Sequence, residues 1–215
     1  WGKRTSWVCR AISSKILKRC IPFTVQMSIT TVCNFKCGYC YAVYPERKIK
    51  DLSKETWFRI IDELADLGTR RISLVGGEPF LRQDVGDLID YISSKRMECA
   101  ATSNGALVPL RIDVAKKLDL LCISLDGDKT AHDLNRGRGT FEKAIDAIKA
   151  AHEHNIPLQV ATTLTKYNIN DICLNYLLDL AKQYNFKIGF ATLVNQVKNG
   201  VKSPLNCQGF LKNSK

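Results

Sequence analysis

The chain has 215 residues, 45% of them hydrophobic, and a formal net charge of +11. This length and composition suit a single globular domain with a sizeable core. No apolar run approaches the roughly 20 residues that a membrane span needs, and no secretory signal pattern opens the sequence. We therefore expect a cytoplasmic protein without a membrane span.

The positive charge is concentrated at the two ends of the chain. Residues 1–20 contain six Lys or Arg and residues 198–215 contain four, with no acidic residue in either stretch. The rest is nearly neutral, with 22 basic and 21 acidic residues. We therefore predict a basic N-terminal extension over 1–21, a core domain over 22–195 and a basic, flexible tail over 196–215. Basic ends can contact RNA, acidic lipid or an acidic partner, but solvated ends explain them as well, and we expect no nucleic-acid partner.

Strands and helices alternate along the core. Apolar patterns predict strands at 25–30, 71–75, 98–102, 120–125, 158–164 and 187–193. The intervening helices are predicted at 53–68, 84–92, 110–118, 140–154 and 169–184, and a short amphipathic helix is possible at 8–17. Ser53 is the expected N-cap of the first core helix, and Gly68 its end.

This alternation predicts parallel strands joined by right-handed crossovers. No G-x-G-x-x-G motif opens a helix, as a dinucleotide-binding sheet would require. Six strand and helix units are fewer than the eight of a closed barrel. The expected fold class is therefore α/β, with the architecture of a partial (β/α)6 TIM-like barrel.

Three of the nine cysteines lie within eight residues, as Cys33, Cys37 and Cys40. Thiolates at this C-x3-C-x2-C spacing suit one soft metal centre, but a closed zinc or iron–sulfur site has four protein ligands. An iron–sulfur cluster held by three thiolates keeps one iron open to a small molecule. A structural zinc with a distant fourth ligand and three unrelated reduced thiols are the alternatives. The other cysteines are scattered, which fits reduced thiols rather than a disulfide framework.

Polar segments follow the next three predicted strands. They are Gly76-Gly77-Glu78-Pro79, Ser103-Asn104-Gly105 and Ser124-Leu125-Asp126-Gly127. Each alone is also an ordinary turn sequence. In a parallel barrel the loops after the strands open on one face, so we expect these segments to meet the cysteine loop there.

Together these motifs resemble those of the radical S-adenosylmethionine (radical SAM) enzymes. The resemblance rests on the three cysteines, with Tyr39 before the last, and on the three polar segments, over about residues 22–195. The segment His132-Asp133-x2-Arg136-Gly137-x-Gly139-Thr140-Phe141 is similar to peptide maturases with a SPASM-type auxiliary-cluster domain. The branch also includes the cyclase of molybdenum-cofactor synthesis, and the resemblance covers the core domain only.

The resemblance implies a [4Fe-4S] cluster on the three cysteines, with S-adenosylmethionine on its open iron. An external donor such as flavodoxin or ferredoxin would supply one electron, and the resulting 5'-deoxyadenosyl radical would take a hydrogen from a peptide or small-molecule substrate. Tyr39 would lie near the adenine. Gly76 and Gly77 would let the backbone approach the methionine ammonium. Glu78 would either orient this ammonium or brace its loop.

Four further residues are implied to hold the cofactor. Ser103, Asn104 and Ser124 would hydrogen-bond the ribose hydroxyls or the methionine carboxylate. Asp126 would join them or only cap the turn that follows it.

The motifs leave the substrate open. Charged or polar residues expected at the mouth of the barrel are Arg82, Arg136, Arg138, Lys166 and Asn168. Arginines suit a carboxylate or a phosphate, although solvated loop positions would explain the same residues. His132 is either a proton carrier or a histidine with a structural hydrogen bond.

Cys207 is the only cysteine after the sixth predicted strand, so we predict no second cluster. The chain is then either a natural minimal enzyme or a core without its substrate-closing domain. The alternative function is a non-catalytic metal-binding or iron–sulfur protein of the same fold that acts through RNA or protein partners.

Overall fold

Six parallel strands form the scaffold of the protein. The computed structural model describes residues 21–40, 50–192, 197–198 and 201–202. The strands of the main sheet are β1 (Thr24–Thr30), β2 (Arg71–Gly76), β3 (Glu98–Ser103), β4 (Leu120–Ser124), β5 (Leu158–Leu164) and β6 (Lys187–Thr192).

Helices connect the strands. The α-helices are α2 (Lys54–Leu67), α3 (Val85–Ser94), α4 (Ile112–Ala115), α5 (Lys129–Arg136), α6 (Thr140–Glu153) and α7 (Asp171–Tyr184). Two 3-10 turns, η2 (Pro79–Leu81) and η3 (Pro109–Arg111), follow β2 and β3. Ser53 caps α2 as predicted, because its side chain accepts a hydrogen bond from the Thr56 N–H.

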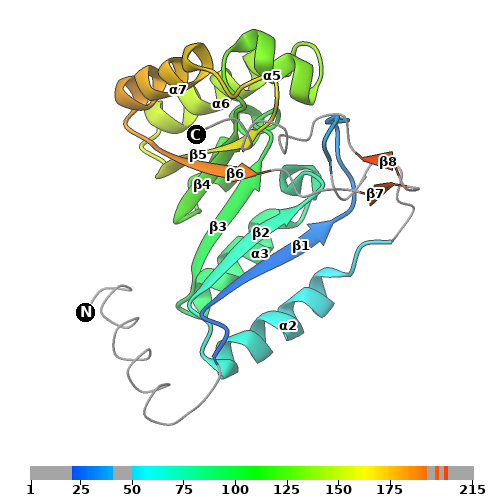
Figure 1. Ribbon diagram of the computed structural model, residues 1–215. Coiled ribbons are helices and arrows are strands. Elements are labelled where there is room, and N and C mark those ends of the chain that lie inside the picture. Colours follow the sequence, from blue (N-terminus) through cyan, green and yellow to red (C-terminus); the bar gives the residue numbers. More distant parts are fainter. Residues whose placement is uncertain (1–20, 41–49, 193–196, 199–200, 203–215) are drawn as a thin grey trace.

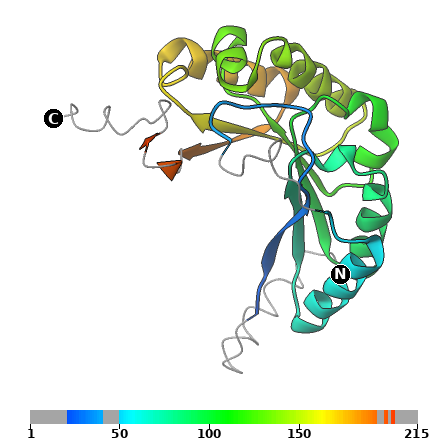
Figure 2. The ribbon, with the colours of Figure 1, turned by 90° about the vertical axis from the view of Figure 1, so that its right-hand side faces the viewer.

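The sheet order follows the chain order from β1 to β6, and every neighbouring pair is parallel. The helices lie along the convex side of the curved sheet, and β1 and β6 are its edges (Figures 1 and 2). The predicted α/β fold, a partial (β/α)6 barrel, is therefore confirmed. All six strands end at the same side, which brings the loops that follow them together.

Buried and partly buried residues alternate along the strands, so the sheet has one face covered by the helices and one concave face. In β2, Ile72 and Leu74 are fully buried and join the core, whereas Ser73 and Val75 are only partly buried. Apolar residues of α3, among them Leu88, pack against the same core. The concave face is thus left open for a site.

The helix predicted at 110–118 is shorter in the structure. Pro109 begins the 3-10 turn η3, and α4 then has only four residues. The Arg111 guanidinium ties this segment to η2, since it donates to the carbonyl oxygens of Phe80 (2.8 Å) and Arg82 (2.7 Å). The Leu118 N–H then closes a turn on the Ala115 carbonyl, which leads directly into β4.

Helix α5 was not predicted, because its buried face is mostly polar. Its buried residues are Ala131, His132, Asn135 and Arg136. This face has no apolar stripe at helical spacing, which is the signal that identified the other helices. A cap signal is present in the sequence, since the Asp128 side chain accepts a hydrogen bond from the Ala131 N–H (2.8 Å).

Part of the predicted C-terminal tail forms regular secondary structure. Two short strands, β7 (Val197–Lys198) and β8 (Val201–Lys202), pair antiparallel within the predicted tail. The possible helix at 8–17 lies outside the described residues, and the three segment boundaries stay a prediction. None of the described helices combines the length and apolar character needed to cross a membrane.

Candidate functional site

The cysteine loop, residues 31–40, follows β1 and presents three thiols. Cys33, Cys37 and Cys40 are free and partly buried. The Phe35 N–H donates to Cys33 Sγ (3.4 Å), and the Cys40 N–H donates to the Cys37 carbonyl oxygen (3.1 Å). Burial raises the pKa of Cys33, and raises that of Cys37 to about 11. Metal binding must therefore displace protons from these thiols.

A cavity of about 420 Å³ lies beside the thiols, within the size range of small-molecule sites. The lining is contributed by the cysteine loop, by α5 and by β1, β2, β3, β4 and β6. Its residues are Gln26, Cys33, Phe35, Cys37, Tyr39, Cys40, Val75, Gly76, Gly77, Thr102, Ser103, Asn104, Ser124, Arg136 and Ala191. The expectation that the loops after the strands meet the cysteine loop is met for Gly76-Gly77, Ser103-Asn104 and Ser124.

The three thiols are spread along the wall of one cavity, which is compatible with the ligands of a cluster. Among the described residues, no three His, Cys, Asp or Glu side chains are grouped so that they could hold one metal ion. Cys33, Cys37 and Cys40 instead line one cavity together. Each thiolate of an iron–sulfur cluster binds a different iron, so such ligands lie farther apart than those of one zinc ion.

Gly76 and Gly77 let the end of β2 pack directly against the cysteine loop. A Cβ at Gly76 would lie 2.4 Å from the Thr30 carbonyl oxygen, and one at Gly77 would lie 2.0 Å from the Val32 carbonyl oxygen. The Gly77 N–H donates to Thr30 (2.9 Å), and the Glu78 N–H donates to Val32 (2.8 Å). These glycines are required by the backbone contact itself, whether or not a ligand approaches them.

Glu78 is fully buried and braces the ends of β2 and β3. Its carboxylate accepts hydrogen bonds from the Phe80 N–H (3.1 Å), the Ser103 hydroxyl (2.8 Å) and the Asn104 N–H (2.7 Å). Burial raises its pKa, against the opposing effect of these three donors. Of the two predicted roles, this geometry favours bracing the loop, because the carboxylate is occupied and Glu78 does not line the cavity.

The side chains of Ser103 and Asn104 are also occupied by protein contacts, although both residues line the cavity. Besides donating to Glu78, Ser103 Oγ accepts a hydrogen bond from the Gly105 N–H (3.0 Å). The Asn104 amide donates to Asn34 Oδ1 (2.7 Å) and accepts from the Ala106 N–H (3.0 Å). These bonds tie the end of β3 to the cysteine loop.

Asp126 is a second fully buried carboxylate, and it does not line the cavity. It accepts hydrogen bonds from the Tyr39 hydroxyl (2.6 Å), Arg136 Nε (2.7 Å) and Nη2 (3.3 Å), and the Thr163 N–H (2.9 Å). The prediction that Asp126 contacts the cofactor is not supported by this geometry. Its partners instead connect the cysteine loop to α5 and β5.

Ser124 and Arg136 line the cavity, and each has a polar atom without a hydrogen-bond partner in the described part of the chain. Ser124 Oγ has no hydrogen-bond partner among the described residues. In the same part of the chain, Arg136 Nη1 has no partner either, since Asp126 engages only Nε and Nη2. A hydroxyl and a cationic donor therefore face the cavity close to the thiols.

Two other cations predicted to contact substrate lie outside the cavity lining. The Arg82 guanidinium is largely buried, pairs with Asp84 (2.6 Å) and donates to the Ile29 carbonyl oxygen (2.9 Å). Lys166 is exposed, and its Nζ lies 4.9 Å from the centre of the Tyr167 ring. Arg82 thus braces the end of β1, and its contact with substrate stays a prediction.

The remaining candidates have structural contacts or lie in solvent. The Asn168 amide donates to the carbonyl oxygens of Asp126 (3.1 Å) and Thr163 (2.8 Å). His132 Nδ1 accepts a hydrogen bond from the Asp126 N–H (3.2 Å), and burial lowers the pKa of His132 to about 4. A structural histidine therefore fits better than a proton carrier. Arg138 is exposed.

Several residues near the site were not predicted. The Asn135 carbonyl oxygen accepts a hydrogen bond from the Gly38 N–H (3.0 Å), and Asn34 and Thr163 make the contacts given above. Asn34 lies between two of the predicted ligands, which was the only signal for it. Asn135 and Thr163 had none, since their roles depend on segments that meet only in the folded protein.

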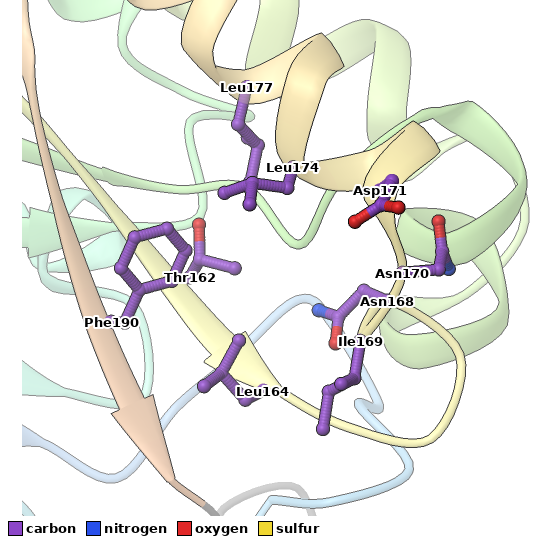
Figure 3. Close-up of a pocket in the computed structure, with 9 residues that line it drawn as sticks. All are labelled: Thr162, Leu164, Asn168, Ile169, Asn170, Asp171, Leu174, Leu177 and Phe190. Atoms are coloured by element: carbon purple, nitrogen blue, oxygen red, sulfur yellow. The ribbon is translucent and has the colours of Figure 1, made fainter.

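A second cavity, of about 360 Å³, lies between α7 and the strands β5 and β6 (Figure 3). It shares no lining residue with the thiol cavity, and apolar side chains dominate its walls. These walls are formed by Thr162, Leu164, Asn168, Ile169, Asn170, Asp171, Leu174, Leu177 and Phe190. It contains no thiol and is therefore separate from the candidate site.

Comparison with known proteins connects this geometry to a family. The family model of the Radical SAM superfamily matches residues 27–181, which include the second half of β1, all of β2 to β5 and most of α7. The match thus contains the three thiols and every predicted cofactor residue.

Similar curated proteins differ in their activities. Fe-coproporphyrin III synthase of Methanosarcina barkeri is 34% identical over 69% of this chain and 38% of its own length. Sporulation killing factor maturation protein SkfB of Bacillus subtilis is 30% identical over 85% of this chain and 46% of its own. GTP 3',8-cyclase of Campylobacter fetus is 32% identical over 77% of this chain and 54% of its own. The chain spans about half the length of these relatives, or less.

Solved structures share the fold. Streptococcus suis SuiB bound to precursor peptide SuiA superposes with a TM-score of 0.77 over 91% of this chain and 45% of that one, at 18% identity. With the fold, the thiol cavity and the family match in agreement, this chain belongs to the radical SAM superfamily, whose enzymes use a [4Fe-4S] cluster and S-adenosylmethionine.

Proposed function

We propose that this chain is the catalytic core of an enzyme that starts radical chemistry from S-adenosylmethionine, with Cys33, Cys37 and Cys40 as cluster ligands. The observation that carries the proposal is that the three thiols share one cavity with the free groups of Ser124 and Arg136. When bound, the cluster and S-adenosylmethionine would supply one-electron cleavage of the sulfonium and removal of a hydrogen atom from the substrate. The electron would come from an external donor such as flavodoxin or ferredoxin.

Different residues of the cavity lining are proposed to bind different parts of the cofactor. Arg136 Nη1 is the cationic donor beside the thiols, so we assign it to the methionine carboxylate rather than to the substrate. The Ser124 hydroxyl would bond the same carboxylate or a ribose hydroxyl, and the Tyr39 ring would contact the adenine. Gly76 and Gly77 leave backbone accessible at the wall. Ser103, Asn104, Glu78 and Asp126 would act by holding these groups in place.

A peptide is the proposed substrate. Two similar proteins support it: the maturation protein SkfB, and SuiB, whose structure was solved with its precursor peptide SuiA. The charge of the cavity agrees, because Arg136 is the only charged side chain in its described lining apart from the thiols, and it is paired with Asp126. A peptide backbone needs hydrogen-bonding groups rather than cations.

A small anionic substrate is the second candidate, since one similar protein is an Fe-coproporphyrin III synthase. Carboxylate groups of such a substrate would require cationic partners near the cavity mouth. Lys166 and Arg138 are exposed residues predicted at the mouth, and neither has an ion pair in the described part of the chain, so they are the proposed contacts in this case. A short peptide precursor encoded beside this gene would favour the first candidate.

The test is anaerobic reconstitution of the protein with iron and sulfide, followed by reduction with dithionite in the presence of S-adenosylmethionine. We expect absorbance near 400 nm, iron and sulfide for one cluster, and release of 5'-deoxyadenosine. Cys37→Ala should abolish both cluster retention and release. Cys173→Ala is the matched control, because it also removes one free thiol, here a buried one at the start of α7, and should retain both.

The alternative function predicts a different result. A non-catalytic protein of the same fold would bind metal without releasing 5'-deoxyadenosine, and zinc at one per chain would identify a structural metal site. Either outcome, in protein that remains folded, would contradict the proposed activity.

A further inference from the structure

The end of α5 touches the cysteine loop at two successive residues. The Gly38 N–H donates to the Asn135 carbonyl oxygen (3.0 Å). The Tyr39 hydroxyl donates to Asp126, and the Arg136 guanidinium lies 5.4 Å from the centre of the Tyr39 ring. Gly38 and Tyr39 are the two residues between Cys37 and Cys40. The position of two of the three thiols therefore depends on α5.

Polar contacts also hold the other side of α5. Asn135 Oδ1 accepts a hydrogen bond from the Thr165 hydroxyl (3.0 Å), and Asp126 accepts one from the Thr163 N–H (2.9 Å). The end of β5 and the residue after it thus support Asp126 and α5, and these in turn support the cysteine loop. The Asp126–Arg136 ion pair lies where these contacts meet, and both of its side chains are at least nine-tenths buried.

Stability alone does not explain this arrangement. A buried ion pair is often no more stabilising than apolar side chains of the same volume. Two further polar atoms, His132 Nε2 and Asn135 Nδ2, are buried without a partner in the described part of the chain. Each such group lowers stability, because it loses its hydrogen bonds to water on folding. We therefore explain the buried polar face of α5 by the geometry that it imposes on the cysteine loop, and not by its contribution to stability.

We propose that the buried Asp126–Arg136 pair is a positioning device, which fixes Gly38 and Tyr39 so that Cys37 and Cys40 face the cavity before any cofactor binds. This property belongs to the cluster-free protein, so it goes beyond the proposed activity. Asp126 acts through Tyr39 and Arg136, and is a positioning residue rather than a ligand.

The pair also balances the charge beside the thiols. The Arg136 guanidinium lines the cavity together with Cys37, and the Asp126 carboxylate is paired with it at 2.7 Å, so charges of opposite sign lie beside the thiols. A cluster bound by three thiolates is anionic and gains negative charge on reduction. Arg136 therefore favours reduction and Asp126 opposes it. This part of the proposal rests on the proposed function, because it requires a cluster.

The first test uses the cluster-free protein and measures hydrogen exchange of the Gly38 amide, which donates to Asn135. Asp126→Asn removes the charge while keeping the size of the side chain. We expect exchange at Gly38 to become at least about tenfold faster, while amides in the core strands keep their protection. Asp84→Asn is the control, since it breaks the Arg82 ion pair, which no hydrogen bond or ion pair of the described residues joins to residues 37–40. It should leave Gly38 unchanged.

The second test measures the reduction potential of the reconstituted cluster by redox titration. Asp126→Asn should shift it upward, and Arg136→Gln should shift it downward. A role in packing alone would not produce shifts of opposite sign. The two tests also separate the proposals, because a chain that binds no cluster would refute the activity while the exchange measurement still decides the positioning role.

If Asp126→Asn does not fold, Tyr39→Phe provides a second variant for the exchange measurement. It removes one of the donors to Asp126 and leaves the Arg136 ion pair intact, so it should fold and speed up Gly38 exchange by a smaller factor. Unchanged exchange at Gly38 in folded Asp126→Asn or Tyr39→Phe protein would overturn the positioning role. Potential shifts of the same sign would overturn the charge balance.

Discussion

The α-carbon of Gly77 lies so close to the carbonyl oxygen of Val32 that an added Cβ would be 2.0 Å from it. This contact joins the turn after β2 to the residue before Cys33. The two segments are held together by backbone hydrogen bonds from Gly77 and Glu78 as well. Cys33, the first of the three proposed cluster ligands, is thus placed by a contact that involves no side chain.

Gly77→Ala should therefore disrupt the cysteine loop. Because the obstacle is backbone, relief requires separation of the turn from the loop, and we expect a loss of stability above about 3 kcal/mol together with failure to retain a cluster. Urea unfolding and iron content measure the two effects. Gly86→Ala is the control: this glycine lies in α3, and its added Cβ would meet Val114 at an ordinary 3.6 Å. That change should be neutral or stabilise by up to about 1 kcal/mol.

Glu78→Gln should destabilise the protein by about 1–3 kcal/mol, because an amide nitrogen would face one of the three donors that the carboxylate now accepts. The loss should appear in urea unfolding of the cluster-free protein, since the bracing role requires no cofactor. An unchanged free energy of unfolding, with weaker binding of S-adenosylmethionine, would show instead that Glu78 contacts the ligand.

Ser124→Ala should weaken binding of S-adenosylmethionine without changing stability, the opposite of the effect expected for Glu78→Gln. Its hydroxyl lines the cavity and has no partner in the described residues, so its loss should leave stability within about 0.5 kcal/mol. Affinity for S-adenosylmethionine should fall about five- to tenfold, as for one lost hydrogen bond. Titration calorimetry on the oxidised, reconstituted protein measures this affinity. Ser73→Ala is the control in β2, outside the cavity lining, and a similar loss of affinity there would argue against a contact by Ser124.

The buried His132 should make stability depend on pH. Its pKa is about 4 in the folded protein, below the ordinary value near 6.5, because burial disfavours its charged form. The unfolded chain therefore binds more protons between these two values. The free energy of unfolding should fall by up to about 3 kcal/mol as the pH drops from about 6.5 to about 4, and this contribution should be intact above pH 7.

His132→Asn should remove this part of the pH dependence, because Asn keeps an acceptor for the Asp126 N–H but does not titrate. Asp126, Asp133 and Arg136 are the charged groups that act on His132, and they remain in the variant. His154→Asn, at an exposed position, is the control. Parallel stability curves for wild type and His132→Asn would show that the histidine is not the titrating group.

The strands and the long helices could be predicted from the sequence because their apolar residues recur at the spacing that burial on one side requires. The same reasoning failed at α5, where Asn135 and Arg136 occupy buried positions. It also overestimated α4, whose length is limited by the contacts of Arg111 with η2.

In the candidate site, the sequence located the thiols and the segments after the strands, since the topology decides which loops meet. It could not distinguish the side chains that face the cavity from those that support it. Ser124 and Asp126 are two residues apart, yet one lines the cavity and the other is fully buried. That distinction depends on partners such as Tyr39, 87 residues away from Asp126.

The same separation along the chain has a consequence for the protein during its synthesis. The cysteine loop leaves the ribosome well before Asp126, Asn135 and Thr163, which hold it in its described shape. At roughly 5–20 residues per second, this delay is several seconds to tens of seconds. The three thiols are therefore synthesised early but reach their folded arrangement late. Until α5 has packed, the loop lacks the contacts that fix Gly38 and Tyr39, so cluster insertion should follow folding of the chain up to β5 and the residues just after it.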